Sequence, residues 1–173
     1  MQENLRKMYS GMAPKASKGG LTMREILFRG KRADNGEWVY GAYQPPVEWG
    51  GRKWDVSIAC VTEHGWLDDI PVIPETVGQF TGLTDKNGEK IFEGDLLDGF
   101  EYPFYRSEDN AHNYFGEIVW FDKAGAFGLV THKYPTSNVR GISAGNCDYI
   151  EEFDLGEWEI IGNIHDNPKL LEG

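Results

Sequence analysis

FTGLTDKNGEKIFEGDLL, residues 80–97, decides the fold, because two apolar runs flank a cluster of turn residues in it. The cluster, Asp85-Lys86-Asn87-Gly88-Glu89, repeats the pattern of Ala33-Asp34-Asn35-Gly36-Glu37 earlier in the chain. Asn and Gly tolerate the positive φ angles of tight hairpin turns, and an Asp side chain can accept hydrogen bonds from nearby backbone N–H groups. Both stretches therefore predict β-hairpins.

The acidic and amide side chains of residues 85–96 do not have the spacing of a calcium-binding loop. Counting from Asp85, the sixth position is Lys90, where such a loop has Gly, and the twelfth is Leu96, where it has Glu. Turn formation explains these residues without a ligand, so we interpret the stretch as a scaffold.

Glu93-Gly94-Asp95 lies between the second apolar run and Leu96-Leu97. Gly94 permits a bend or bulge there, and Asp95 can accept hydrogen bonds from the backbone N–H groups that the bend leaves unpaired. A catalytic Asp95 would need a partner group, and the sequence indicates none. We therefore predict a structural role for Asp95.

The remaining chain from Met23 onward predicts short strands, because its apolar runs are rich in β-branched and aromatic residues and end at turn residues. The predicted strands are 26–32, 37–43, 54–61, 116–122, 127–134 and 157–164. A single helical turn is predicted at Pro168-Lys169-Leu170-Leu171, with Asn167 as its cap. The fold class is all-β.

The formal net charge of −11 disfavours direct nucleic-acid binding, since contact with phosphates relies on Lys and Arg. Cys60 and Cys147 are far apart, without CxxC spacing, and are expected to be reduced thiols of a cytoplasmic protein. Cys60 lies on the apolar face of its predicted strand and is expected in the core rather than as a nucleophile. No segment approaches the ~20 apolar residues of a membrane span.

Residues 1–22 differ from the rest of the chain. They contain four basic residues and one acidic residue, a net charge of +3, which leaves −14 for the remainder. Gly, Ser and Pro without an apolar period predict a flexible tail. Lys18-Gly19-Gly20 can also be encoded by a bacterial ribosome-binding sequence at a suitable distance before Met23. Translation starting at Met23, with an upstream extension before it, is therefore an equal alternative.

Motifs of nucleotide binding, metalloproteases and serine hydrolases are absent from the sequence. His64, His112, His132 and His165 have no spacing that suggests a shared metal. We therefore predict no catalytic, cofactor or metal site, and no enzyme activity. A hydrolase that uses a carboxylate or a His stays an alternative, which a cleft with a strongly perturbed carboxyl pKa beside a His would favour.

Two long polar segments, residues 100–115 and 134–155, interrupt the predicted strands. Loops of this length are usually functional or disordered. Aromatic side chains among acidic ones can contact a partner protein, or cover the open end of a barrel. The candidate partner contacts are Tyr102, Phe104, Tyr105, Glu151 and Glu152.

Three blocks of sequence together resemble the YopX family of bacteriophage and prophage proteins. The first block is residues 23–32 with 34–41, the second runs from Pro74 to Asp95, and the third is residues 161–164 with Asn167-Pro168 and Leu170-Leu171. The resemblance implies a β-rich fold, a C-terminal part similar to an SH3-like barrel, and self-association. It implies no established catalytic residues. The residues expected to carry structural motifs are Gly36, Gly82, Asp85, Asn87, Gly88, Gly94, Asp95, Gly162, Asn163 and Pro168.

We therefore expect an all-β protein with an SH3-like small barrel over residues 72–171, an N-terminal β-hairpin layer over residues 23–71, and the tail at 1–22. The expected function is non-enzymatic interaction with an unidentified protein partner. An acidic decoy that occupies a nucleic-acid-binding host protein is the alternative within binding, because −14 over the chain from Met23 makes it electrostatically plausible.

Overall fold

The computed structural model describes residues 25–61, 65, 67–101, 112–132, 147–149 and 157–172. The predicted tail and the candidate partner contacts Tyr102, Phe104, Tyr105, Glu151 and Glu152 lie outside these residues. The described chain is built of antiparallel strands, so the all-β prediction is confirmed. None of the sheets formed by the described residues closes into a barrel.

The first sheet has six strands in the order β6-β5-β2-β1-β7-β8. Because β7 pairs with β1, this sheet continues beyond residue 71. Its strands are β1 (Phe28–Lys31), β2 (Trp38–Gln44), β5 (Ser57–Val61), β6 (Leu67–Pro71), β7 (Gly78–Thr84) and β8 (Lys90–Phe92).

The second sheet has five strands in the order β12-β11-β10-β9-β13. Ile118 and Leu129 face each other across its central pair of strands and are fully buried. The strands are β9 (Asp95–Glu101), β10 (His112–Phe121), β11 (Ala126–His132), β12 (Cys147–Tyr149) and β13 (Glu159–Asn163).

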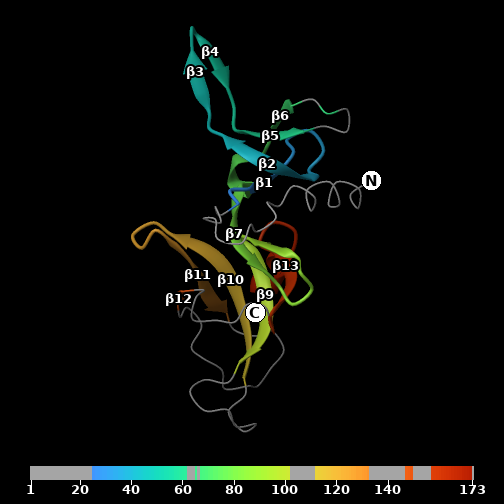
Figure 1. The fold of residues 1–173 in the computed structure, drawn as a ribbon, viewed down its shortest axis with the longest axis vertical. Helices are drawn as coiled ribbons and strands as arrows, with labels where there is room; N and C mark the ends of the chain where they lie inside the picture. Colours follow the sequence, from blue (N-terminus) through green and yellow to red (C-terminus); the bar gives the residue numbers. More distant parts are fainter. Residues whose placement is uncertain are drawn as a thin grey trace, which may run out of the picture.

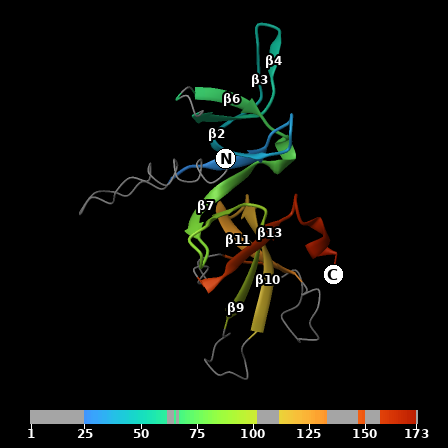
Figure 2. The same ribbon diagram turned by 90° about the vertical axis from the view of Figure 1, so that its right-hand side faces the viewer.

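A separate hairpin, β3 (Val47–Trp49) and β4 (Arg52–Trp54), forms a two-stranded sheet of its own. Figures 1 and 2 show the two larger sheets following one another along the long axis of the molecule, with β7 between them and the β3–β4 hairpin projecting at one end. The hairpin therefore extends away from both sheets.

The short strand β8 contributes to the core of both sheets. Ile91 packs with Leu97 and Trp158 in the core of the second sheet. The next residue, Phe92, packs with Leu27 and Phe80 in a core of the first sheet. Successive side chains of a strand point to opposite faces, so adjacent apolar residues can serve two cores.

Two short 3-10 helices complete the described chain, η1 (Pro74–Thr76) and η5 (Pro168–Leu171). The second one occupies the position of the predicted helical turn. Asn167 precedes it without a side-chain capping bond, contrary to the expected cap. Its side-chain oxygen instead accepts a hydrogen bond from the backbone N–H of Asn163 at 3.2 Å.

The turn between β7 and β8 is organised by Asp85, which is almost fully buried. Its Oδ1 accepts hydrogen bonds from the backbone N–H groups of Asn87 and Glu89, at 2.8 and 2.9 Å. Its Oδ2 accepts one from the N–H of Ile160 in β13, at 3.2 Å. These bonds lower the pKa of Asp85 against the opposing effect of burial, which is the largest single influence. The polar cluster thus fixes a turn and also attaches β13 to it.

Gly88 ends this turn with a φ of 79°, and Gly36 has a φ of 73° in the turn after β1. No atom lies within 4 Å of where a Cβ of Gly88 would stand. A substitution there consequently meets backbone strain but no steric clash.

We predict that Gly88→Val destabilises the protein by about 1–2 kcal/mol, the approximate cost of placing a branched residue in the left-handed region. Gly88→Asn is the matched control and should lose less, because Asn tolerates that region better. Urea denaturation of the parent and both variants measures the difference. Equal midpoints for Val and Asn would contradict the turn argument.

Candidate functional site

The two sheets meet at a buried ion pair between Arg29 of β1 and Asp95, the first residue of β9. Arg29 Nη2 lies 2.6 Å from Asp95 Oδ1, and Asp95 is only 1% exposed. The same guanidinium nitrogen donates a hydrogen bond to the carbonyl of Glu93 at 3.1 Å. Burial raises the pKa of Asp95, although the charge of Arg29 acts in the opposite direction. Asp95 is thus enclosed in the protein rather than presented in a cleft.

Gly94 produces the bend that brings Asp95 to Arg29. Its φ is 80°, in the left-handed region. The Gly94 N–H donates to Ile118 of β10 at 2.8 Å, and its carbonyl accepts from Ile164 at 2.9 Å. Asp95 Oδ2 in turn accepts the backbone N–H of Phe92 at 2.7 Å. This backbone contact is the role that the sequence predicts for Asp95.

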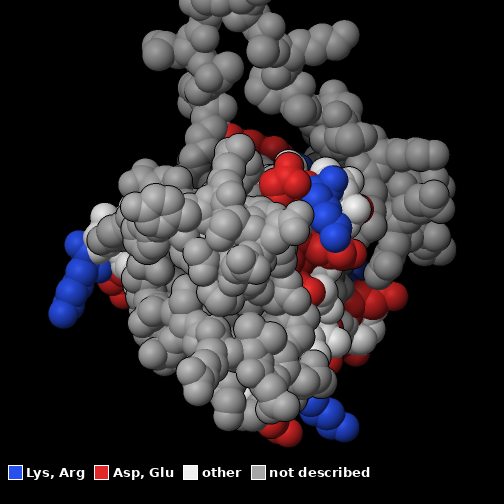
Figure 3. Space-filling view, turned by 90° about the horizontal axis from the view of Figure 1, so that it is seen from below, with Lys and Arg blue, Asp and Glu red and all other residues white. Residues whose placement is uncertain are grey.

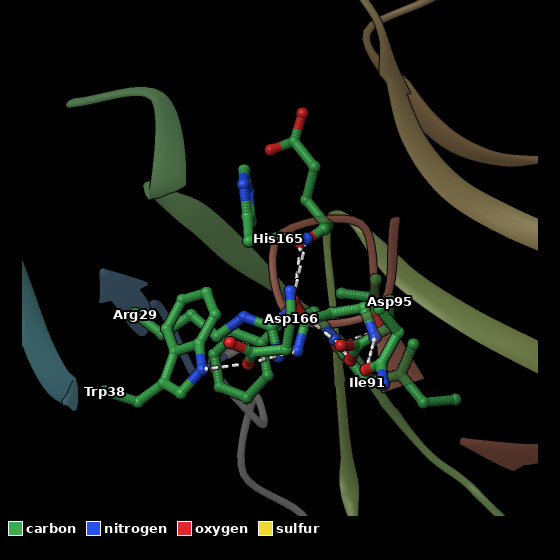
Figure 4. A network of polar contacts seen from close by, with 11 residues as sticks. Arg29, Trp38, Ile91, Asp95, His165 and Asp166 are labelled. Carbon is green, nitrogen blue, oxygen red and sulfur yellow. Dashed lines mark hydrogen bonds and ion pairs between the residues drawn. The ribbon is translucent and has the colours of Figure 1, made fainter. Parts of the chain in front are cut away.

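Aromatic rings enclose the charged end of Arg29. The guanidinium carbon lies 4.6 Å from the centre of the Trp38 ring and 4.9 Å from that of Phe92. The Trp38 indole N–H donates to Asp166 Oδ2 at 2.8 Å, and Lys31 forms an ion pair with the same carboxylate. Figure 4 shows Trp38 hydrogen-bonded to Asp166, with Arg29 and Asp95 in the same group of side chains. Burial raises the pKa of Asp166, but hydrogen bonds from Asn163, Lys31 and Trp38 together with the charge of Lys31 outweigh it and lower this pKa to about 2.

The turn after β13 is held by Asn163, whose side-chain oxygen accepts the backbone N–H groups of His165 and Asp166 at 3.0 and 2.9 Å. At Gly162, a Cβ would lie 2.4 Å from Asn167 Oδ1, so this position has no room for a side chain. Pro168 begins the 3-10 helix that follows. This turn thereby carries Asp166 to the network around Trp38.

Gly82 completes the set of predicted structural residues. It has a φ of 94° within β7, where the pairing of β7 with β8 is irregular. Cys60, expected in the core, is only half-buried, while its neighbours Ile58 and Ala59 are buried. Burial raises the pKa of the Cys60 thiol, which disfavours the thiolate that a nucleophile needs.

Glu93 and His165 line one small cavity of about 120 Å³ beside Gly94. Burial raises the pKa of Glu93. Burial and the positive charges of Arg29 and Lys31 lower the pKa of His165. Neither residue is predicted as a site residue from the sequence, and no motif surrounds them. Within the described ranges, no three His, Cys, Asp or Glu side chains are grouped so that they could hold a metal ion.

The β3–β4 hairpin exposes apolar side chains on one face. Its register pairs Val47 with Trp54 and Trp49 with Arg52, and paired residues share a face of the hairpin. Trp49 is 78% exposed and Trp54 48%. The opposite face carries the exposed ion pair of Glu48 and Lys53, at 3.5 Å. The molecule therefore presents an aromatic and a charged face on the same projecting element.

The β3–β4 hairpin is not among the predicted strands, although the sequence contains a hairpin pattern. Gly50-Gly51 stands between Val47-Glu48-Trp49 and Arg52-Lys53-Trp54, and a Gly-Gly pair between two strand-like runs is a hairpin pattern. Both glycines have positive φ angles, 61° and 77°. Each flanking run was too short to be recognised as a strand.

We predict that Asp95→Ala lowers the free energy of unfolding by about 3–5 kcal/mol, because it leaves the buried charge of Arg29 unpaired. Asp95→Asn keeps one acceptor oxygen for the Phe92 N–H and should lose less. Glu48→Ala is the control, since it removes an exposed ion pair and should cost less than about 1 kcal/mol. Denaturant midpoints of the four proteins measure these effects, and a parent-like Asp95→Ala would contradict the structural role.

Comparison with known proteins assigns the family. A crystal structure of protein EF1440 from Enterococcus faecalis is 23% identical to the chain, with a TM-score of 0.42, and the match covers 86% of this chain and 99% of that one. No curated protein matches the chain. The described residues contain no helix long and apolar enough to cross a membrane. The family model of the YopX protein matches residues 27–172, and the chain therefore belongs to the YopX family.

Proposed function

We propose that the protein is a non-enzymatic protein-interaction module that contacts its partner through the aromatic face of the β3–β4 hairpin. The exposed Trp49 and Trp54, with Arg52 on the same face, are the observation that supports this proposal. Trp and Arg are the residue types that are enriched among the strongest contributors to protein interfaces.

The stability of the hairpin supports the same proposal. An isolated two-stranded hairpin is marginally stable in water, and β3–β4 pairs with neither of the larger sheets. Covering Trp49 and Trp54 by a partner removes apolar surface from water, which favours association. The interaction then stabilises the hairpin as well as the complex.

The proposal also includes a biological setting. We further propose that the protein acts in the cytoplasm of a bacterium that carries a phage or prophage. Residues 72–171 contain the SH3-like barrel of this proposal, and a second copy of the chain is one candidate partner. Membership of the YopX family supports this setting. Tyr102, Phe104, Tyr105, Glu151 and Glu152 stay candidate contacts in addition to the hairpin.

The proposal predicts that Trp49→Ser with Trp54→Ser abolishes partner binding and leaves the fold intact. The matched control is Glu48→Ser with Lys53→Ser, which alters the opposite face of the same hairpin. Tagged parent, aromatic variant and control would be compared in capture from a bacterial lysate and in sedimentation of the purified chain. If the parent and the control bind a partner or self-associate and the aromatic variant does neither, the result supports the aromatic face of the hairpin as the contact surface. Equal retention by the aromatic variant would refute it.

A hydrolase is the second candidate function, because Glu93 and His165 line the same cavity with pKa values shifted in opposite directions. A carboxyl whose pKa is raised can donate a proton, and a neutral His can accept one. This arrangement predicts hydrolysis of simple chromogenic esters, phosphates or glycosides by the parent and its loss in His165→Gln. If parent and variant give the same rate on every substrate, the hydrolase candidate fails.

The acidic-decoy alternative requires an extended acidic surface. Figure 3 views the molecule from the end opposite the β3–β4 hairpin, and the described part of this face shows basic side chains beside acidic ones. Ion pairs such as Lys86 with Glu159, at 2.5 Å, also neutralise acidic groups locally. These observations favour the hairpin over a surface of unbroken negative charge.

A further inference from the structure

A second cavity, of about 330 Å³, opens between the first sheet and β10. Its lining includes three aromatic side chains, Phe28 of β1, Tyr43 of β2 and Trp120 of β10, and one carboxylate, Glu93. The volume is at the lower end of the range of about 300–1,000 Å³ that is usual for ligand sites. The cavity is therefore large enough for a small ligand or a single side chain.

The aromatic walls are held by neighbouring rings. Phe28 and Tyr43 pack against each other with their ring centres 5.4 Å apart. Trp120 packs edge-to-face on Phe127 with a separation of 4.9 Å, and Phe127 is buried. Trp120 itself is 38% exposed. A ring that is fixed from behind and open to solvent at its other side is available to a ligand.

The carboxylate of Glu93 is half-buried at this cavity and has no cationic partner there. Among the described residues, no Lys or Arg side chain lies within ion-pair distance of it. The guanidinium of Arg29 contacts the Glu93 carbonyl and is paired with Asp95. The backbone of Glu93 is held by a hydrogen bond from its N–H to the carbonyl of Gln79 at 3.0 Å. Within the described part of the chain, the Glu93 carboxylate therefore forms no ion pair across this cavity.

The face of an aromatic ring and a carboxylate both bind cations. The negative face of an aromatic ring attracts a cation, and the attraction is stronger when water is excluded. Quaternary ammonium groups are bound by proteins in this way. A buried carboxylate is stabilised by a cation beside it. A neutral ligand of the same shape would gain only the apolar contacts.

We propose that this cavity is a binding site for an organic cation, an alkylated ammonium group held by the rings of Phe28, Tyr43 and Trp120 and by the carboxylate of Glu93. The site is separate from the β3–β4 hairpin and does not depend on the function proposed for it. It also needs no proton transfer between Glu93 and His165.

The charge of Glu93 makes this binding pH-dependent. Burial and Asp122 raise the pKa of Glu93, while Arg29 lowers it. Glu75, Glu117 and His165 line the neighbouring cavity that Glu93 shares. The cation requires the ionised carboxylate, so affinity should be greatest above the raised pKa of Glu93 and fall as the pH decreases through it.

The test compares choline with its neutral isostere 3,3-dimethylbutan-1-ol on the full chain, by calorimetry and by the NMR signals of the Trp indole N–H groups. We expect choline to bind at least about tenfold more tightly than the isostere. Its affinity should fall as the pH is lowered through the raised pKa of Glu93, because the carboxyl becomes protonated. Equal affinities for the two probes would overturn the proposal.

Variants assign the binding to this cavity. Glu93→Gln should reduce the affinity for choline about tenfold and leave that for the isostere unchanged. Tyr43→Leu and Trp120→Leu should weaken choline binding, and Leu67→Ala at an exposed position of β6 is the control that should not. Tyr43→Leu keeps the test valid if Trp120→Leu fails to fold. Choline binding that survives Glu93→Gln and Tyr43→Leu would place the ligand elsewhere and refute the assignment.

The source of the cation is distinguished by peptides that carry trimethyllysine or leucine at the same position. Binding of choline together with the trimethyllysine peptide identifies a side chain of a partner protein as a ligand of the site. Binding of choline alone identifies a free small molecule. If neither choline nor the trimethyllysine peptide binds at millimolar concentration, the proposal is wrong.

Discussion

The buried ion pair of Arg29 and Asp95 is the constraint on which the arrangement of the two sheets depends. A buried charge without its partner is strongly unfavourable, so β1 and the start of β9 must be buried together. The distance of 2.6 Å is reached because Gly94 bends the chain immediately before Asp95. The rings of Trp38 and Phe92 then enclose the guanidinium. Three separate parts of the sequence, around Arg29, Trp38 and residues 92–95, are thereby fixed around one pair of charges.

Asp85 and Asp95 use the same chemistry for different purposes. Both accept backbone N–H groups within the segment 80–97, and both also reach outside it, to Ile160 and to Arg29 respectively. Each carboxylate therefore organises a local turn and attaches a distant strand to it. A segment rich in Asp, Asn and Gly can consequently be the centre of a fold without binding a ligand.

Local structure could largely be predicted from the sequence, because turns and strand alternation depend on neighbouring residues. Asn87-Gly88 and Gly94-Asp95 indicate their bends directly, and the all-β class follows from the strand-like runs. The partners of Asp95 could not be predicted in the same way. Arg29 lies 66 positions before it in an apolar run, and nothing in the sequence marks that Arg as buried.

The candidate sites were even harder to predict from the sequence. The cavity beside Glu93 collects side chains from β1, β2 and β10, which are distant in sequence. Trp54 lies in a predicted strand and Trp49 in none, and only the structure shows that their hairpin pairs with neither larger sheet. The candidate sites, like the Arg29–Asp95 pair, thus depend on long-range packing, whereas the hairpin turns depend on local turn chemistry.

The position of Ile91 and Phe92 on opposite faces of β8 has a consequence for how the protein opens. Pulling β8 away from the first sheet also removes Ile91 from the core of the second sheet. The two sheets therefore form one cooperative unit, in which amide hydrogens of β1 and β10 exchange with solvent through the same global opening. The β3–β4 hairpin shares neither core, so its amides exchange locally while both sheets stay closed. Among the described strands, we therefore expect the β3–β4 hairpin with its exposed Trp residues to open independently of the two sheets.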